Sequence, residues 1–167
     1  MTSPSGRFEF RIELPVRSEW DHIEKIRASV MDCFTTVFRT VDNCIAIANI
    51  AGELMENAVK YGNWGEGQTH LMLRIWGDDA VAHVEVQSPV DPDGSDVSEL
   101  LGTVAWLRTV ENAADAYRSR LIDTSRAPRG VSKLGLARVA YEGDCALEAE
   151  LVGGSVKVLA TTRLRTG

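Results

Sequence analysis

A carboxylate and a carboxamide four residues apart are the strongest candidates for chemistry in this sequence. Glu53 and Asn57 lie in the segment 52–62, where helical spacing places both side chains on one face. Such a pair could hold a magnesium ion, or orient a hydroxyl or a water for attack on a phosphoryl group. A solvated helix face explains the same pattern, because Glu56 and Lys60 form a common i,i+4 ion pair. Spacing alone leaves both interpretations open.

The length and composition limit what surrounds this pair. With 167 residues, 44% of them hydrophobic and 25% charged, the chain is expected to form one globular domain. A net charge of −6 argues against nucleic-acid binding. No apolar run is long enough for a membrane span, and the first residues lack signal-peptide features. We therefore expect a cytoplasmic protein with a disordered tail at 1–6, a single domain at 7–167 and no membrane partner.

The candidate pair is expected at the polar end of a helix that is otherwise apolar. Apolar periodicity predicts a first helix from Ser18 to Phe38 and a second from Ile45 to Tyr61. Gly62 is expected to close the second helix in the left-handed conformation that favours glycine. The second helix should therefore pack one face inward and present Glu53 and Asn57 on the other.

Alternating residues predict the strands that support these helices. A strand is expected at 8–14, and two hairpins are expected from the pairs 69–76 with 80–87 and 146–151 with 155–164. The long connection at 88–132 is turn-rich and contains a short apolar piece at 97–101 and an amphipathic helix at 104–121. We interpret 88–132 as a lid region with its own helix.

The remaining cysteines and histidines have structural explanations. Cys33, Cys44 and Cys145 match neither a disulfide framework nor a zinc site, so buried thiols are expected. His70 and His83 lie in predicted strands without a third metal ligand at a matching spacing.

Basic residues and glycines gather near the C-terminal end of the lid. The segment 117–134 has one acidic residue, Asp123, against five basic ones, which suits either an anion site or a solvated face. The following segment, 130–140, is a glycine-punctuated turn that leads into a short helix, and the exposed N–H groups at such a helix start suit a phosphate. The five basic residues are Arg118, Arg120, Arg126, Arg129 and Lys133.

The order of these elements resembles the ATP-binding fold shared by gyrase, Hsp90, histidine kinases and MutL, the GHKL family with its Bergerat-type fold. Residues 53–61 look like the N box of that family, and residues 130–136 look like its second glycine box. In size, the chain is most similar to the bacterial anti-sigma-factor serine/threonine kinases. The resemblance implies an α+β fold, a two-layer sandwich in which helices cover one face of a mixed, mostly antiparallel sheet.

The resemblance also implies ATP and Mg²⁺ as cofactors and assigns roles to individual residues. Glu53 would be the catalytic base, and Asn57 would coordinate the magnesium ion. Lys60 would approach the phosphates, and Tyr61 would lie beside the nucleotide. The phosphate tail would be cradled by the second glycine box, that is, by Gly130, Lys133, Gly135 and Leu136.

The first glycine box is degenerate, which opens a second interpretation. Ser88 occupies the position of the family's adenine-binding aspartate, although Asp91 or Asp93 could substitute after a shift of the loop. In the second box, Lys133 replaces a glycine and adds a positive charge. The sequence therefore predicts a magnesium-dependent serine/threonine kinase, or alternatively a non-catalytic regulator that acts by partner binding alone.

The expected partner is a small protein, either a STAS-type antagonist or a sigma factor. Kinases of this kind commonly dimerise through the first strand and first helix. Phe8, Phe10 and Trp20 could form such a homodimer contact, although core packing explains them equally well.

Overall fold

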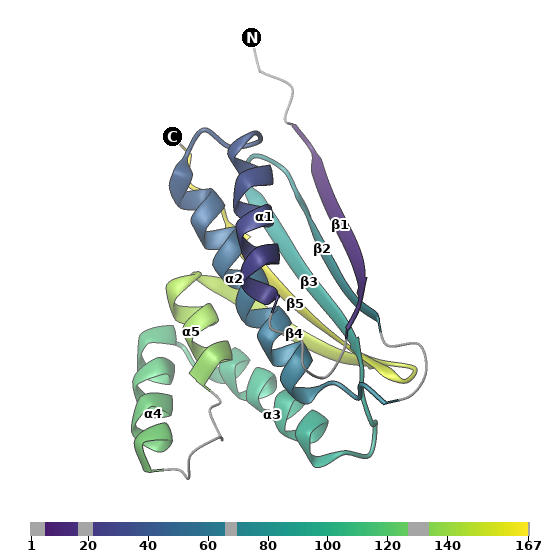
Figure 1. Cartoon of the computed structure of the whole chain (residues 1–167). Coiled ribbons are helices and arrows are strands. Elements are labelled where there is room, and N and C mark those ends of the chain that lie inside the picture. Colours follow the sequence, from purple (N-terminus) through teal and green to yellow (C-terminus); the bar gives the residue numbers. More distant parts are fainter. Residues whose placement is uncertain (1–5, 17–21, 66–69, 127–133, 167) are drawn as a thin grey trace.

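The structure is a computed structural model that describes residues 6–16, 22–65, 70–126 and 134–166. Its five strands form one sheet in the order β1-β2-β3-β5-β4, and each neighbouring pair is antiparallel (Figure 1). The α+β fold class is confirmed, and no pair among these strands is parallel, so the sheet is antiparallel rather than mixed. The strands are β1 (Phe8–Pro15), β2 (His70–Gly77), β3 (Val81–Pro89), β4 (Cys145–Val152) and β5 (Ser155–Arg163).

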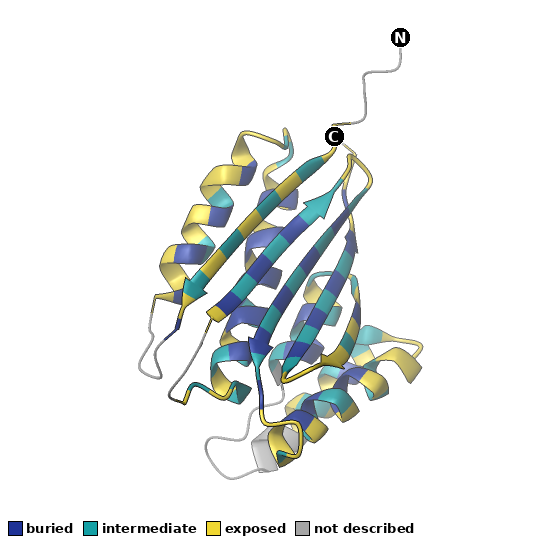
Figure 2. Ribbon diagram, turned by 90° about the vertical axis from the view of Figure 1, so that its right-hand side faces the viewer, coloured by how far each residue is buried: buried dark blue, intermediate teal, exposed yellow. Residues whose placement is uncertain are grey.

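The helices cover one face of this sheet and leave the other face open (Figure 2). Burial alternates along β2 and β3, because successive side chains point to opposite faces of a strand. The helix-facing residues are buried, whereas the residues on the open face are only partly covered. The helices are α1 (Ile23–Thr35), α2 (Val41–Tyr61), α3 (Ser95–Thr109), α4 (Ala113–Arg126) and α5 (Leu134–Glu142).

The core lies between α2 and the middle of the sheet. Ile47, Leu54 and Met55 of α2 are at most 1% exposed, as are Leu73 of β2 and Val84 of β3. Burying each such side chain contributes about 1.5–3 kcal/mol. This burial fixes the rotation of α2, so its opposite, polar side faces outward between α1 and α5.

The start of α2 differs from the prediction. The helix begins at Val41 rather than Ile45, so Asp42 and Asn43, which precede the predicted start, lie in its first turn. Asn43 is buried there, and its side chain exchanges two hydrogen bonds with the backbone of Arg165, at 3.0 and 2.9 Å. A distant segment therefore satisfies a polar residue that local sequence predicts to interrupt the helix.

The end of α2 also differs from the prediction. Gly62 has φ −69° and ψ 152°, an extended rather than a left-handed conformation. The Trp64 ring packs against it, and a Cβ on Gly62 would lie 2.5 Å from that ring. The glycine is thus explained by close packing of an aromatic ring.

The first helix is shorter than predicted at its C-terminal end. α1 ends at Thr35 rather than Phe38, where the Thr35 and Thr36 hydroxyls donate to the carbonyls of Asp32 and Cys33. These bonds compete with continuation of the helix. The predicted start at Ser18 lies outside the described residues.

The lid region contains two helices instead of one short piece and one helix. α3 runs through Gly102 to Thr109, and α4 starts at Ala113, after three intervening residues. The Asn112 side chain accepts a hydrogen bond from the backbone N–H of Ala114 at 2.9 Å, which is a typical helix N-cap. This cap separates two helices that periodicity alone merges.

The thiols and the aromatic residues of β1 are placed as follows. Cys44 is buried and Cys145 is mostly covered, but Cys33 is exposed on α1, so the prediction of a buried thiol is wrong there. Cys33 faces solvent because the next residue, Phe34, points into the core.

The Phe8 ring packs on Phe34 at 5.5 Å between centroids, so core packing accounts for Phe8.

None of the described helices is both long and apolar enough to cross a lipid bilayer.

Candidate functional site

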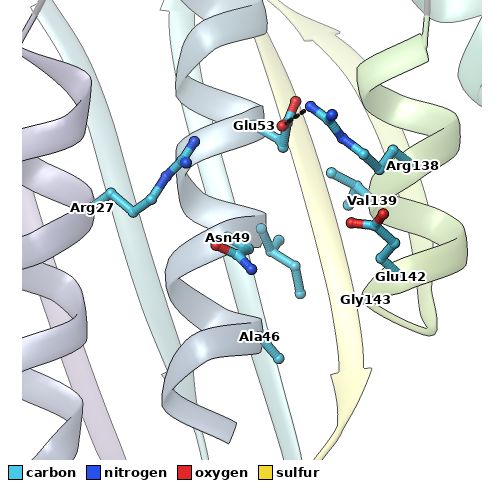
Figure 3. Close-up of a pocket in the computed structure, with 9 residues that line it drawn as sticks. Arg27, Ala46, Asn49, Glu53, Arg138, Val139, Glu142 and Gly143 are labelled. Atoms are coloured by element: carbon cyan, nitrogen blue, oxygen red, sulfur yellow. Dashed lines mark hydrogen bonds and ion pairs between the residues drawn. The ribbon is translucent and has the colours of Figure 1, made fainter. Parts of the chain in front are cut away.

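The centre of the candidate site is an ion pair between α2 and α5. The Glu53 carboxylate accepts a hydrogen bond from the Arg138 guanidinium, and the two side chains point toward each other across the gap between the helices (Figure 3). The side chains are 15% and 39% exposed, so the pair is partly shielded from water. Sequence reasoning missed Arg138. The sequence signal that could have found it is a basic residue within the otherwise apolar segment 134–140, which follows the glycine turn.

The pKa of Glu53 is raised, which suits a group that must accept a proton. Burial is the main cause, and Glu56 on the same helix adds repulsion. Attraction to Arg138, its hydrogen bond and the charge of Arg27 oppose the rise without cancelling it. A carboxylate whose pKa is raised binds a proton more readily than a solvated one.

Asn57 and Gly135 complete the contact between the two helices. The Asn57 Nδ2 group donates to the Glu53 carbonyl at 2.8 Å, which leaves its Oδ1 oxygen as an acceptor. A Cβ on Gly135 would lie 2.9 Å from Glu53 Oε2 and 3.4 Å from Asn57 Nδ2. The start of α5 therefore approaches the carboxylate and carboxamide so closely that only glycine fits without a shift.

Leu136 has a packing role in this structure. Its side chain is 4% exposed and belongs to the hydrophobic core. It anchors α5 against the domain and so holds Gly135 at the polar pair.

Lys60 and Tyr61 lie farther along α2, at its C-terminal end. The Lys60 Nζ atom lies 5.3 Å from the centre of the Tyr61 ring. Burial raises the pKa of Tyr61, and the acidic Glu99 and Asp96 of α3 raise it further. This end of α2 therefore faces the beginning of the lid region, away from the Glu53–Arg138 pair.

Ser88 and Asp91, the candidates for the adenine side, have local structural roles. Ser88 is 2% exposed and pairs with Val156 within the sheet, so its hydroxyl is closed off from solvent. Asp91 Oδ1 accepts a hydrogen bond from the backbone N–H of Asp93 at 3.1 Å, which closes a turn. Neither residue presents an open hydrogen-bonding group beside the polar pair in this structure.

Part of the predicted phosphate cradle cannot be placed. Gly130 and Lys133 lie outside the described residues, as does Arg129 of the basic segment. Of the other basic residues there, Arg118 pairs with Asp115 at 3.6 Å, and Arg120 stacks over Trp106 at 4.5 Å. These contacts favour a structural explanation for Arg118 and Arg120.

A cavity of about 290 Å³ adjoins the Glu53–Arg138 pair between α1, α2 and α5. Arg27 enters from α1, Asn49 lies one turn before Glu53, and Glu142 lies one turn after Arg138 (Figure 3). Arg27 crosses directly over Gly52, where a Cβ would lie 2.1 Å from its Nε atom. We call this space the α2–α5 cavity.

The described residues offer few side-chain ligands for a metal ion. They contain no group of three or more His, Cys, Asp or Glu side chains that could hold an ion. His83 contacts the Thr161 hydroxyl at 3.0 Å and stacks on Trp76, which agrees with a structural histidine. Asn57 supplies a single oxygen, which suits Mg²⁺ only where phosphate oxygens and waters provide the other ligands.

The comparisons with known proteins give a fold but no family. No family model matches the chain, and no curated protein matches it. A chain in the crystal structure of the SiaB–SiaC complex from Pseudomonas aeruginosa superposes with a TM-score of 0.67. The match covers 93% of this chain and 89% of that chain at 18% identity, so it shows a shared fold alone.

These findings contradict the assignment to the GHKL family and its anti-sigma-factor kinases. That assignment rested on the order of the elements and on two short motifs, yet no family model matches, and the structural similarity found is to a chain of the SiaB–SiaC complex. A nine-residue helical motif specifies one helix face, and helix packing can produce such a face in many proteins. The geometry of Glu53, Asn57 and Gly135 is independent of the family assignment.

Proposed function

We propose that this chain is a regulatory protein that acts on a protein partner by magnesium- and ATP-dependent phosphoryl transfer to a serine or threonine hydroxyl. The observation that carries the proposal is the convergence of Gly135 on Glu53 and Asn57. This arrangement puts a proton acceptor, a carboxamide and the start of a helix next to one another. Phosphoryl transfer depends on such positioning and on charge neutralisation.

The residues would divide the work as follows. Glu53 would take the proton of the attacking hydroxyl, which its raised pKa favours. Asn57 would hold Mg²⁺ through Oδ1, and the ion would neutralise charge on the phosphates of ATP. The N–H groups at the start of α5 would face the phosphates. A protein partner is supported by the similar fold found within a protein–protein complex.

A matched pair of asparagine variants tests the proposal. Asn57→Ala is expected to lower the affinity for ATP with Mg²⁺ by about tenfold or more in isothermal titration, because a charge-assisted contact is worth about 1.5–3 kcal/mol. Asn49→Ala, two turns earlier on the same helix, is the control and should bind as the wild type does. Absence of binding heat in all three proteins would remove the proposal.

A second function is favoured by two specific observations. The Glu53 carboxylate is engaged by Arg138, and Ser88 is closed off from solvent. Both agree with a non-catalytic regulator that sequesters its partner. In that case Glu53→Gln would retain the partner as well as the wild type, and neither protein would transfer label from γ-labelled ATP to it.

A further inference from the structure

The α2–α5 cavity continues into a second cavity at the start of α2. The second cavity has a volume of about 420 Å³ and extends from Asp42 and Ile45 on α2 to the C-terminal residues 162–165. The two cavities share four lining residues, so they adjoin and form one groove along the outward side of α2. We call it the α2 groove. The shared residues are Ala46, Asn49, Glu142 and Gly143.

The proposed site lies at one end of the α2 groove. Glu53, Asn49 and Ala46 follow one another along α2, and Glu142 and Gly143 lie across from them, at the end of α5 (Figure 3). Under the proposed function, the hydroxyl of a protein partner approaches Glu53. The rest of the groove is then the space into which the partner's chain extends from that hydroxyl.

Two apolar side chains are exposed at the other end of the groove. Val41 is 57% exposed and Ile45 is 43% exposed, and they lie one turn apart on α2. Ile45 also lines the groove itself. Adjacent apolar side chains that open onto a groove suit contact with an apolar side chain of a partner. We call Val41 and Ile45 the α2 ledge.

The middle of the groove carries an acidic side chain that is open to a basic partner group. Glu142 is the charged residue among the four that line both cavities, and it forms no ion pair with another described residue. The neighbouring Arg138 is engaged by Glu53, and Arg27 is engaged by Glu24 and Glu56. A basic side chain of a partner therefore complements the charge in the middle of the groove.

The spacing along α2 fixes where such partner residues would lie. Ile45 precedes Glu53 by eight positions, with Asn49 midway. At a rise of about 1.5 Å per residue, this part of the helix is about 12 Å long, which an extended chain covers in about four residues. Side chains two and four positions apart in an extended chain point to the same side. All three partner side chains would therefore face α2.

We propose that the α2 groove binds an extended segment of the protein partner, in which a basic residue lies two positions, and an apolar residue four positions, from the serine or threonine hydroxyl. The proposal rests on the proposed function, which places that hydroxyl at Glu53. Glu142 would contact the basic residue and the α2 ledge the apolar one. These residues thus determine which partner segments are accepted.

Fluorescence anisotropy with labelled peptides tests the groove without nucleotide. The matched peptides are alanine-rich and carry serine, arginine two positions away and leucine four positions away, in either chain direction. In the control peptides the leucine lies five positions away. A matched peptide should bind about fivefold more tightly than its control, because its leucine reaches the ledge. Equal affinities, or no binding by either matched peptide, would overturn the proposal.

A pair of variants with exposed apolar side chains tests the α2 ledge. Ile45→Ser should weaken binding of the matched peptide by about fivefold, because the leucine loses its apolar contact. Leu151→Ser at the end of β4 is the control, since Leu151 is 40% exposed and lines neither cavity of the groove. Both variants alter exposed positions and should fold normally. An equal effect of the two variants would contradict the proposal.

A double-mutant cycle tests the contact with Glu142. Glu142→Gln should weaken the arginine peptide by about twofold to fivefold, because an exposed ion pair is lost. The same variant should leave unchanged the affinity of a peptide with glutamine in place of arginine. If both peptides lose affinity equally, Glu142 does not read the basic residue.

Two further measurements separate the alternatives. A wild-type dimer in sedimentation that becomes monomeric in Ile45→Ser would assign the ledge to a second copy of this chain and overturn the proposal. Selective peptide binding without transfer of label from γ-labelled ATP would keep the groove and remove the kinase. Transfer to serine peptides regardless of their arginine and leucine, unchanged in Ile45→Ser, would do the reverse.

Discussion

The α2–α5 junction and the end of β3 both contain polar residues that the sequence predicts as site residues. Their surroundings in the structure differ. At the junction, Glu53, Asn57 and Gly135 come from two helices and meet at contact distance. At the end of β3, Ser88 is buried within the sheet, and Asp91 closes its own turn. At the junction, side chains from two helices converge on one point, whereas at the end of β3 one polar residue is enclosed by the sheet and the other closes a turn.

The largest expected effect is at Gly135. Gly135→Ala places a Cβ 2.9 Å from Glu53 Oε2, so the end of the Glu53 side chain must shift. A displacement of about 1 Å at a reacting group can cost about 10²-fold in rate, so the loss expected in phosphoryl transfer is up to about 10²-fold. Gly102→Ala on α3, where nothing lies within 4 Å of the added Cβ, is the control and should gain about 0.5–1 kcal/mol of stability. Equal activity in both variants would show that the junction is not the reacting centre.

An intermediate effect is expected in the pH dependence of stability. The pKa of Glu53 is raised in the folded protein above its ordinary value of 4.5. Its contribution to stability is therefore fully present below pH 4.5 and is lost as pH rises through the folded pKa. Relative to Glu53→Gln, the wild type should lose free energy of unfolding across that window, as measured by urea denaturation at several pH values. A difference that grows with pH would mean that the Arg138 pair outweighs burial.

The smallest effect is expected at the end of β3. Because Ser88 is closed off from solvent and lies in the sheet, Ser88→Ala should change the affinity for ATP by less than about twofold. If Ser88 hydrogen-bonds the adenine, the loss should be about tenfold instead. Titration calorimetry on Ser88→Ala and Asp91→Ala separates these outcomes and decides whether the contrast between the two regions holds in solution.

Most elements of the fold could be predicted from sequence, because their signals are local. Alternation along β2 and β3 and the apolar face of α2 gave the strands, the helix and the α+β class. The predicted helix boundaries are wrong where a contact with a distant segment, or a single hydrogen bond, determines where a helix begins or ends. Asn43 enters α2 because Arg165 satisfies its side chain, and Asn112 divides the lid helices with one hydrogen bond. The family assignment failed because an order of elements and two short motifs carry too little information to specify a family.

For the candidate site, the sequence by itself determined that Glu53 and Asn57 share the outward face of one helix, because helical spacing fixes which residues are neighbours. Only the tertiary structure decided that Arg138, far along the chain, holds the Glu53 carboxylate and that Gly135 touches both polar groups. It also decided that Ser88 is buried. The docking of α5 on α2 and the register of the sheet depend on core packing between distant segments, which no local pattern encodes.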